Sequence, residues 1–272
     1  MNRIAFVSDI HGNLPALEAV AAQIAAAGVD TVVNLGDIAS GPLWPRETVQ
    51  WLMQRDWPTI AGNHERQVLT LPRERMGASD AFAAAQLGEP ERAWLAALPP
   101  SRWCGEQVFC CHGTPTDDLQ YLLETVVPGF DPTDPAPATP GLRAATAVEL
   151  QVRLAGLAHQ PLQPTLLACG HSHVPRIAAQ AHTLLLNPGS VGLQAYDDVH
   201  PHPHWVETGH PQACWALAEL GPAGWQLALM ATPYDFQAAA RRADENDRGD
   251  WADALRTGRV GRLEPATIAS VI

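Results

Sequence analysis

Apolar and polar positions follow two alternating periods along the first third of the chain. Residues 4–7 and 31–35 are short apolar runs, as expected of buried strands. Between them, apolar side chains recur at helical spacing, at Leu14, Leu17, Val20 and Ile24. Asn13 precedes this stretch as a candidate N-cap. The pattern predicts a strand, a helix and a second strand, which is the order typical of α/β proteins.

Similar patterns of apolar and polar positions continue along the rest of the chain. Further strands are predicted at residues 59–61, 107–111, 165–169, 183–186, 214–220 and 225–230. Helices are predicted over residues 46–55, over 72–98 with a break near Gly88 and Pro90, and over 235–255. We expect one domain over residues 1–272, with residues from about 213 to 260 packed on the same core.

Composition narrows the class of protein. Apolar residues make up 46% of the chain and charged residues 17%, and no apolar run is long enough to span a membrane. Met1 to Ile10 predict a strand and not a secretion signal, so we expect a cytoplasmic protein without a membrane partner. The five cysteines include no CxxC pair, which favours a reducing compartment and cysteines that only fill space.

The formal net charge of −12 argues against extended nucleic-acid binding, which needs clustered basic side chains. An anionic substrate would then need a local positive charge, and bound metal ions can supply one. We therefore expect the partner to be a small phosphate ester, with nucleotides among the candidates. A homo-oligomer is left open by the sequence.

Polar motifs stand directly after the predicted strands. The residues that could bind metal in these motifs are Asp9, His11, Asp37, Asn63, His112, His171 and His173. Ligands of α/β sheets bind beyond the carboxyl ends of strands, so these side chains are expected to converge. Imidazole, carboxylate and amide oxygen together suit divalent metal ions.

The set is too large for one closed tetrahedral zinc site, so two divalent ions are implied. We expect Mn²⁺ first, with Fe, Zn, Ni and Co as alternatives, because the ligand types admit all of them. Asp37 is the candidate bridge between the ions. A metal-bridging hydroxide could then attack phosphorus in line at neutral pH.

The ordered motifs resemble those of the calcineurin-like metallophosphoesterase superfamily, which are DxH, GD, GNH[DE], H and GHxH. The resemblance runs from residue 9 to about residue 192. It implies an α/β fold in which two mixed β-sheets pack as a sandwich with flanking helices, in four layers. It also implies a phosphoric ester hydrolase.

The resemblance assigns roles to the matching residues. It implies that one metal is held by Asp9, His11 and His173, the other by Asn63, His112 and His171, and both by Asp37. It leaves His64 free to contact the substrate phosphate beside Asn63. His64 is therefore the candidate catalytic general acid that assists the leaving oxygen.

The closest resemblance is to small YfcE-like phosphodiesterases, because the chain reads GHSHVP and then NPGSV. Protein phosphatases and dinucleoside tetraphosphatases usually continue the second motif as GDxxDRG, whereas Ser40 and Gly41 stand at its Asp and Arg positions. The missing Arg favours a phosphodiesterase. A phosphomonoesterase and a dinucleoside polyphosphate hydrolase are the alternatives. The missing Asp leaves His64 without an orienting carboxylate, unless Glu65 substitutes.

A rival from another class is a non-catalytic scaffold on the same fold, like the retromer subunit that lacks the catalytic histidine. His64 argues against it. Asn187 and Ser190 are interpreted as parts of a turn. The stretch from His200 to His210 is interpreted as an extended loop, and residues 131–141 as a surface loop. Loops around residues 115–141 and 193–211 are expected to shape the mouth of the site.

Overall fold

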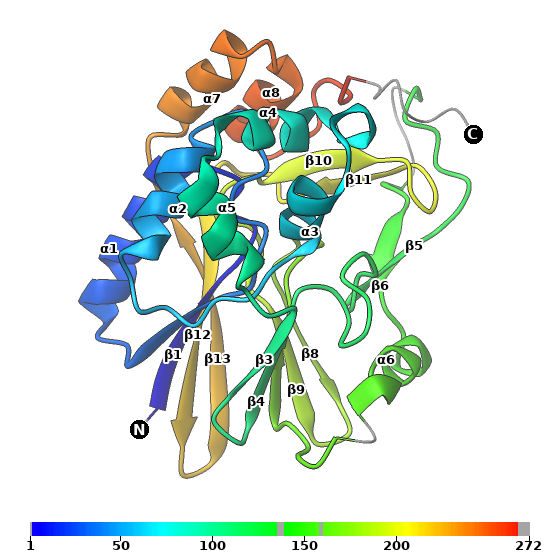
Figure 1. The fold of residues 1–272 in the computed structure, drawn as a ribbon. Helices are drawn as coiled ribbons and strands as arrows, with labels where there is room; N and C mark the ends of the chain where they lie inside the picture. The colour runs from blue at the N-terminus through cyan, green and yellow to red at the C-terminus, as the bar shows by residue number, and fades with distance from the viewer. Residues whose placement is uncertain (1, 135–138, 158–159, 266–272) are drawn as a thin grey trace.

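Two mixed β-sheets form the centre of the molecule, with helices outside them (Figure 1). The computed structural model describes residues 2–134, 139–157 and 160–265. The arrangement is the mixed α/β sandwich that the sequence predicts.

The first sheet has the strand order β13-β12-β1-β2. Its strands are β1 (Asn2–Val7), β2 (Thr31–Asn34), β12 (Ala213–Gly221) and β13 (Gly224–Thr232). Strand β1 runs parallel to β2 and antiparallel to β12. The N-terminal strand is thus an interior strand, held on one side by a segment from near the other end of the chain.

The second sheet has the order β3-β4-β7-β9-β8, in which β4, β7 and β9 run parallel. Its strands are β3 (Ser101–Cys104), β4 (Val108–Cys111), β7 (Leu166–Ala168), β8 (Arg176–Gln180) and β9 (Thr183–Asn187). Two small antiparallel pairs stand apart from it: β5 (Glu124–Val126) with β6 (Leu142–Ala144), and β10 (Ala195–Asp198) with β11 (His204–Glu207).

The helices lie around these sheets. They are α1 (Leu14–Ala27), α2 (Pro45–Met53), α3 (Asn63–Thr70), α4 (Ala78–Gln86), α5 (Glu89–Ala96), α6 (Ala147–Arg153), α7 (Phe236–Glu245) and α8 (Gly249–Thr257), with short 3₁₀ turns at Arg73–Arg75 and Ala155–Leu157. Figure 1 shows α1, α2 and α5 beside the first sheet, α6 beside the second, and α7 and α8 at the end toward which β1 runs.

The sheets pack face to face because the strands alternate in what they bury. On β1, Ile4 and Phe6 join residues of β4, β7 and β9 in the core between the sheets. Ala5 and Val7 point the other way and pack with α1 residues such as Leu17. This period of two gives β1 one face for the core between the sheets and one face for the helices.

Most predicted elements are confirmed, including the break between α4 and α5. The strand predicted at residues 59–61 is only a single bridge from Thr59 to Asn34. Helices α3 and α6, strands β3 and β8 and the small strand pairs were not predicted. The single helix predicted over 235–255 is two helices, α7 and α8. The predicted surface loop at 131–141 has neither helix nor strand in its described residues, but residues 135–138 lie outside them. The one-domain organisation stays a prediction.

Replacing Phe6 with Ala should lower the free energy of unfolding by about 3–5 kcal/mol, because Phe6 is fully buried between the sheets. Leu229→Ala is the control, since Leu229 is 40% exposed on strand β13 and should cost less than about 1 kcal/mol. Urea denaturation measures both. Equal losses would contradict the placement of Phe6 at the centre of the sandwich.

Candidate metal centre

The sequence-predicted metal ligands gather where strands from both sheets end. Asp9 and His11 follow β1, Asp37 follows β2, Asn63 opens α3, His112 follows β4, and His171 and His173 follow β7. Two groups of side chains bring their ligand atoms within 4.8 Å of one another: Asp9 with His11 and His173, and Asp37 with His112 and His171. The first group contains three of the residues predicted to hold one metal. The second contains Asp37 with His112 and His171, two of the residues predicted to hold the other. That these residues bind metal stays a prediction.

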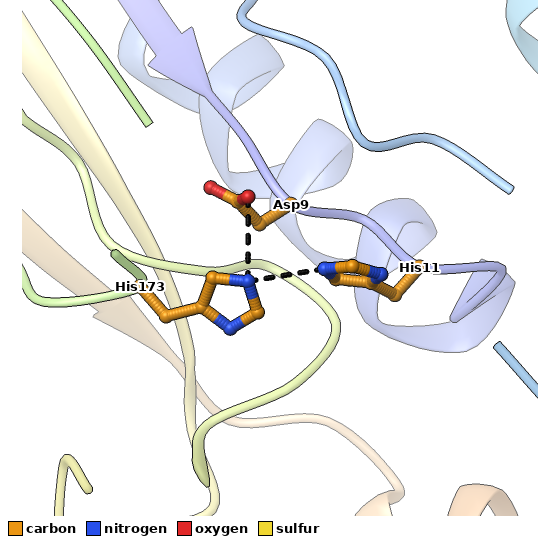
Figure 2. Close-up of side chains that lie close together, drawn as sticks. All are labelled: Asp9, His11 and His173. Carbon is orange, nitrogen blue, oxygen red and sulfur yellow. Dashed lines mark hydrogen bonds and ion pairs between the residues drawn. The ribbon is translucent and has the colours of Figure 1, made fainter. Parts of the chain in front are cut away.

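The first group is shown in Figure 2. The Nε2 atoms of His11 and His173 lie 3.0 Å apart. The Nε2 atom of His173 also lies 3.3 Å from the Oδ1 atom of Asp9. All three side chains are buried, so their ligand atoms face one another and have little contact with water.

The second group centres on His112. Its Nε2 atom lies 3.0 Å from the Oδ2 atom of Asp37 and 3.1 Å from the Oδ1 atom of Asn63. The same nitrogen lies 3.9 Å from the Oδ1 atom of Asp9, which belongs to the first group. The two groups are therefore neighbours, and His112 of the second group lies close to Asp9 of the first.

Backbone carbonyls fix the orientation of three imidazole rings. The accepting oxygens are Ser40 O at 2.7 Å from His11 Nδ1, Leu35 O at 2.8 Å from His112 Nδ1, and Leu193 O at 2.8 Å from His173 Nδ1. Because each Nδ1–H donates outward, each Nε2 faces into the site and is the nitrogen that can offer a lone pair to a metal ion. Ring nitrogens and buried carboxylate oxygens that face the same point are suitable ligands for a divalent cation.

Electrostatics favour the metal-binding form at His11, His171 and Asp37. Burial, with the nearby His173, lowers the pKa of His11 to about 3. Burial, with His112, lowers the pKa of His171 to about 4. Burial alone would raise the pKa of Asp37, but the histidines outweigh it and hold this pKa well below its usual range. Neutral imidazole and ionised carboxylate are the forms that bind metal. At His112 the charges of Asp37 and Asp9 outweigh burial and raise the pKa to about 9, so a metal ion would have to displace a proton from this ring.

Five of the seven candidate ligands share an uncommon backbone conformation. Positive φ angles occur at Asp9 (55°), His11 (51°), Asp37 (55°), His171 (67°) and His173 (55°). Residues other than glycine adopt this conformation at a cost of about 1–3 kcal/mol each, and such strain is concentrated at functional sites. The turns after the strands are therefore shaped to direct these side chains inward.

Glu65 joins the turns that carry Asp37 and Asn63. Its carboxylate accepts hydrogen bonds at 2.8 Å from the backbone N–H groups of Asp37, Ile38 and Gly62. The side chain is buried and fully used by these contacts. The suggestion that Glu65 orients His64 is therefore wrong, because its oxygens are engaged with the backbone.

His64 is oriented by Asp80, a contact that was not predicted from the sequence. The Nδ1 atom of His64 lies 2.8 Å from the Oδ1 atom of Asp80, and its Nε2 atom lies 4.0 Å from Asp37. Burial alone would lower the pKa of His64, but Asp80 and Asp37 outweigh it and raise this pKa to about 10. The side chain is 28% exposed, so a substrate can reach it.

The position of the missing family arginine is filled by another part of the chain. A Cβ atom on Gly41 would lie 2.5 Å from the carbonyl oxygen of His11 and 2.8 Å from the ring of Trp251. Trp251 comes from α8 and meets the His11 ring edge to face, with centroids 5.9 Å apart. An arginine at position 41 is therefore sterically excluded.

The turn interpretation of Asn187 and Ser190 is confirmed. The Oδ1 atom of Asn187 accepts a hydrogen bond from the backbone of Gly189 at 2.9 Å. The hydroxyl of Ser190 donates to the carbonyl oxygen of Asp9 at 2.7 Å and accepts from the backbone of Leu193. Both side chains support the backbone beside the metal ligands.

The histidine-rich stretch, residues 200–210, is not all loop, because β11 begins at His204. The buried His204 lies 3.0 Å from the hydroxyl of Tyr121, which lies 2.6 Å from that of Tyr196. Tyr196 donates to the carbonyl oxygen of His171. Among the described residues, no potential metal-binding group includes a histidine of this stretch. Through Tyr121 and Tyr196, His204 supports the backbone of His171.

Comparison with known proteins agrees with this geometry. Residues 2–202 match the model of the calcineurin-like phosphoesterase superfamily domain. The chain belongs to this superfamily. It is therefore a metal-dependent phosphoester hydrolase, as the sequence predicts.

Several proteins resemble this phosphoesterase over nearly its whole length. The uncharacterized protein MJ0912 of Methanocaldococcus jannaschii is 23% identical, over 94% of this chain and 98% of its own. A metallophosphoesterase from Sphaerobacter thermophilus has a TM-score of 0.67 at 23% identity, covering 94% of this chain and 99% of that one. The hypothetical protein PH1004 of Pyrococcus horikoshii has a TM-score of 0.67 at 16% identity, covering 95% and 99%. These likenesses show a shared fold.

In the part of the phosphoesterase that the structure describes, every helix is too short or too polar to cross a bilayer.

Replacing Gly41 with Ala should weaken metal binding and lower the free energy of unfolding by about 1–3 kcal/mol, because the added Cβ collides with the backbone of His11. Gly77→Ala is the matched control, since nothing lies within 4 Å of its Cβ position and its φ of −60° suits alanine. Metal titration and thermal unfolding measure both effects. Unchanged binding in Gly41→Ala would show that the turn tolerates the methyl group.

Proposed function

We propose that the chain is a two-metal phosphodiesterase. In this proposal Asp9, His11 and His173 hold one divalent ion, Asn63, His112 and His171 hold the other, and Asp37 touches both. The observation that carries the proposal is the pair of adjacent donor groups, with ring nitrogens fixed toward each other by backbone carbonyls. Mn²⁺ is our favoured ion because the mixture of imidazole, carboxylate and amide oxygen suits it.

When bound, such a pair of ions supplies an activated water for attack on phosphorus and neutralises the charge that develops there. His64 lies at the edge of this centre, with its Nε2 atom 4.0 Å from Asp37. We assign it the transfer of a proton to the leaving oxygen. Asp80 keeps the Nδ1 atom engaged, so that Nε2 faces the substrate. The pairing of His64 with Asp80 argues against a non-catalytic scaffold.

The preference for diesters rests on Gly41 and Trp251. A monoester dianion offers two charged oxygens, which a bidentate arginine recognises well. The carbonyl of His11 and the indole of Trp251 leave no room for an arginine at position 41. We therefore expect the site to favour the single negative charge of a diester.

Metal-stripped protein resupplied with Mn²⁺ should hydrolyse bis-p-nitrophenyl phosphate faster than p-nitrophenyl phosphate. Asp37→Asn should lower the rate by more than about 100-fold, because even residues behind the metal ligands typically contribute 10–100-fold. Release of nitrophenolate measures both. Faster monoester cleavage would point to a phosphatase instead, and no turnover with any first-row metal would contradict the proposed activity.

Replacing His64 with Ala should reduce cleavage of alkyl or ribose diesters by about 10²-fold or more, since their leaving oxygens need a proton. Nitrophenyl diesters need little protonation and should lose less than about tenfold. The ratio of kcat values for the two ester types is the quantity to measure. If both types slow equally, His64 is not the proton donor.

A further inference from the structure

Arg66 lies one helical turn beyond the metal-ligand candidate Asn63. Both residues belong to α3, and residues three apart on a helix share a face. The rise of one turn, about 5 Å, places Arg66 beside the second ligand group and not within it. The guanidinium binds the carboxylate of Asp118 through two hydrogen bonds, at 2.8 and 2.7 Å.

Asp118 belongs to the loop that follows β4. The next residue, Leu119, lies near the His171 ring, because its backbone acts to raise the pKa of His171. The ion pair thus joins the helix of Asn63 to the loop that supports His171, on two sides of one ligand group. The pKa of Arg66 is raised mainly by its hydrogen bonds to Asp118, and the charge of Asp37 adds to the effect. Arg66 is therefore within electrostatic reach of the metal centre.

The pair is exposed and easily exchanged. The Arg66 side chain is 45% exposed and that of Asp118 is 30% exposed. Exposed ion pairs contribute roughly 0–1 kcal/mol, so an incoming anion can replace Asp118 at little cost. Arg248 differs, because its side chain is only 7% exposed and is held by both Asp250 and Glu264.

We propose that Arg66 is a substrate-binding residue that exchanges Asp118 for a second phosphate group of the ester. The inference rests on the proposed function and narrows its substrate class. The metal centre and His64 act on the phosphate group that is attacked. Arg66 binds a neighbouring phosphate group through two hydrogen bonds from its guanidinium. The favoured substrates are phosphodiesters that carry a further phosphate, as in nucleotide derivatives.

Two esters that differ only in that group provide the test. They are the p-nitrophenyl ester of thymidine 5′-phosphate and the same ester with an added 3′-phosphate. Arg66→Gln should raise KM for the 3′-phosphorylated ester about tenfold or more, the usual effect of losing a charged hydrogen-bonded contact. It should leave KM for the other ester within about twofold. Asp118→Asn should lower KM for the 3′-phosphorylated ester, because it removes the competing carboxylate.

Arg143→Gln is the matched control. Arg143 forms a bidentate pair with Glu149 at 2.9 and 2.8 Å, and their side chains are 44% and 27% exposed. It lies on β6 and contributes to neither ligand group, so both KM values should stay unchanged. If Arg66→Gln changes both esters equally, or neither, the proposal is wrong.

A binding measurement separates this proposal from the proposed function. If the unmodified protein turns over neither ester, the proposed phosphodiesterase activity fails. Calorimetric titration with thymidine 3′,5′-bisphosphate and thymidine 5′-phosphate, in the presence of Mn²⁺, then decides the role of Arg66. Tighter binding of the bisphosphate that Arg66→Gln abolishes supports the proposal. Equal binding of the two nucleotides overturns it.

Discussion

The convergence of buried carboxylates and imidazoles at the strand ends is the constraint on which the rest of the structure depends. Strands β1 and β2 of one sheet bring Asp9 and Asp37 to the histidines that follow β4 and β7 of the other. Buried charges are costly unless paired or bound to metal, and the turns that carry them are strained. Cations at this point would offset both costs. Metal binding and the relative position of the two sheets are therefore coupled.

The sequence predicted the core of this site because its signals are local. Each metal-binding motif directly follows an apolar run, so the strand order alone brings the ends together. The structure brings Asp9 together with His11 and His173, and Asp37 together with His112 and His171, so the predicted residues do converge. Helix α1 was equally readable from its apolar spacing and the N-cap candidate Asn13, and helix α2 from its apolar spacing. Local periodicity was sufficient wherever burial alternated regularly.

The missed features depend on contacts between distant segments. Asp80 lies in the first turn of α4, where an acidic residue commonly only stabilises a helix, so nothing marked it as the partner of His64. Trp251 reaches the site from α8, which lies beyond the matched family region. Residues 59–61 were predicted as a strand from three apolar positions, yet only Thr59 pairs. Such outcomes are decided by tertiary packing and not by local pattern.

We propose that each chain binds two divalent ions in adjacent sites. Calorimetric titration of metal-stripped protein with Mn²⁺ tests it most directly, with elemental analysis of the loaded protein as the check on stoichiometry. We expect two ions per chain for the unmodified protein and one for His11→Ala, which removes a ligand of the first group only. A stoichiometry of one or zero in the unmodified protein would contradict it.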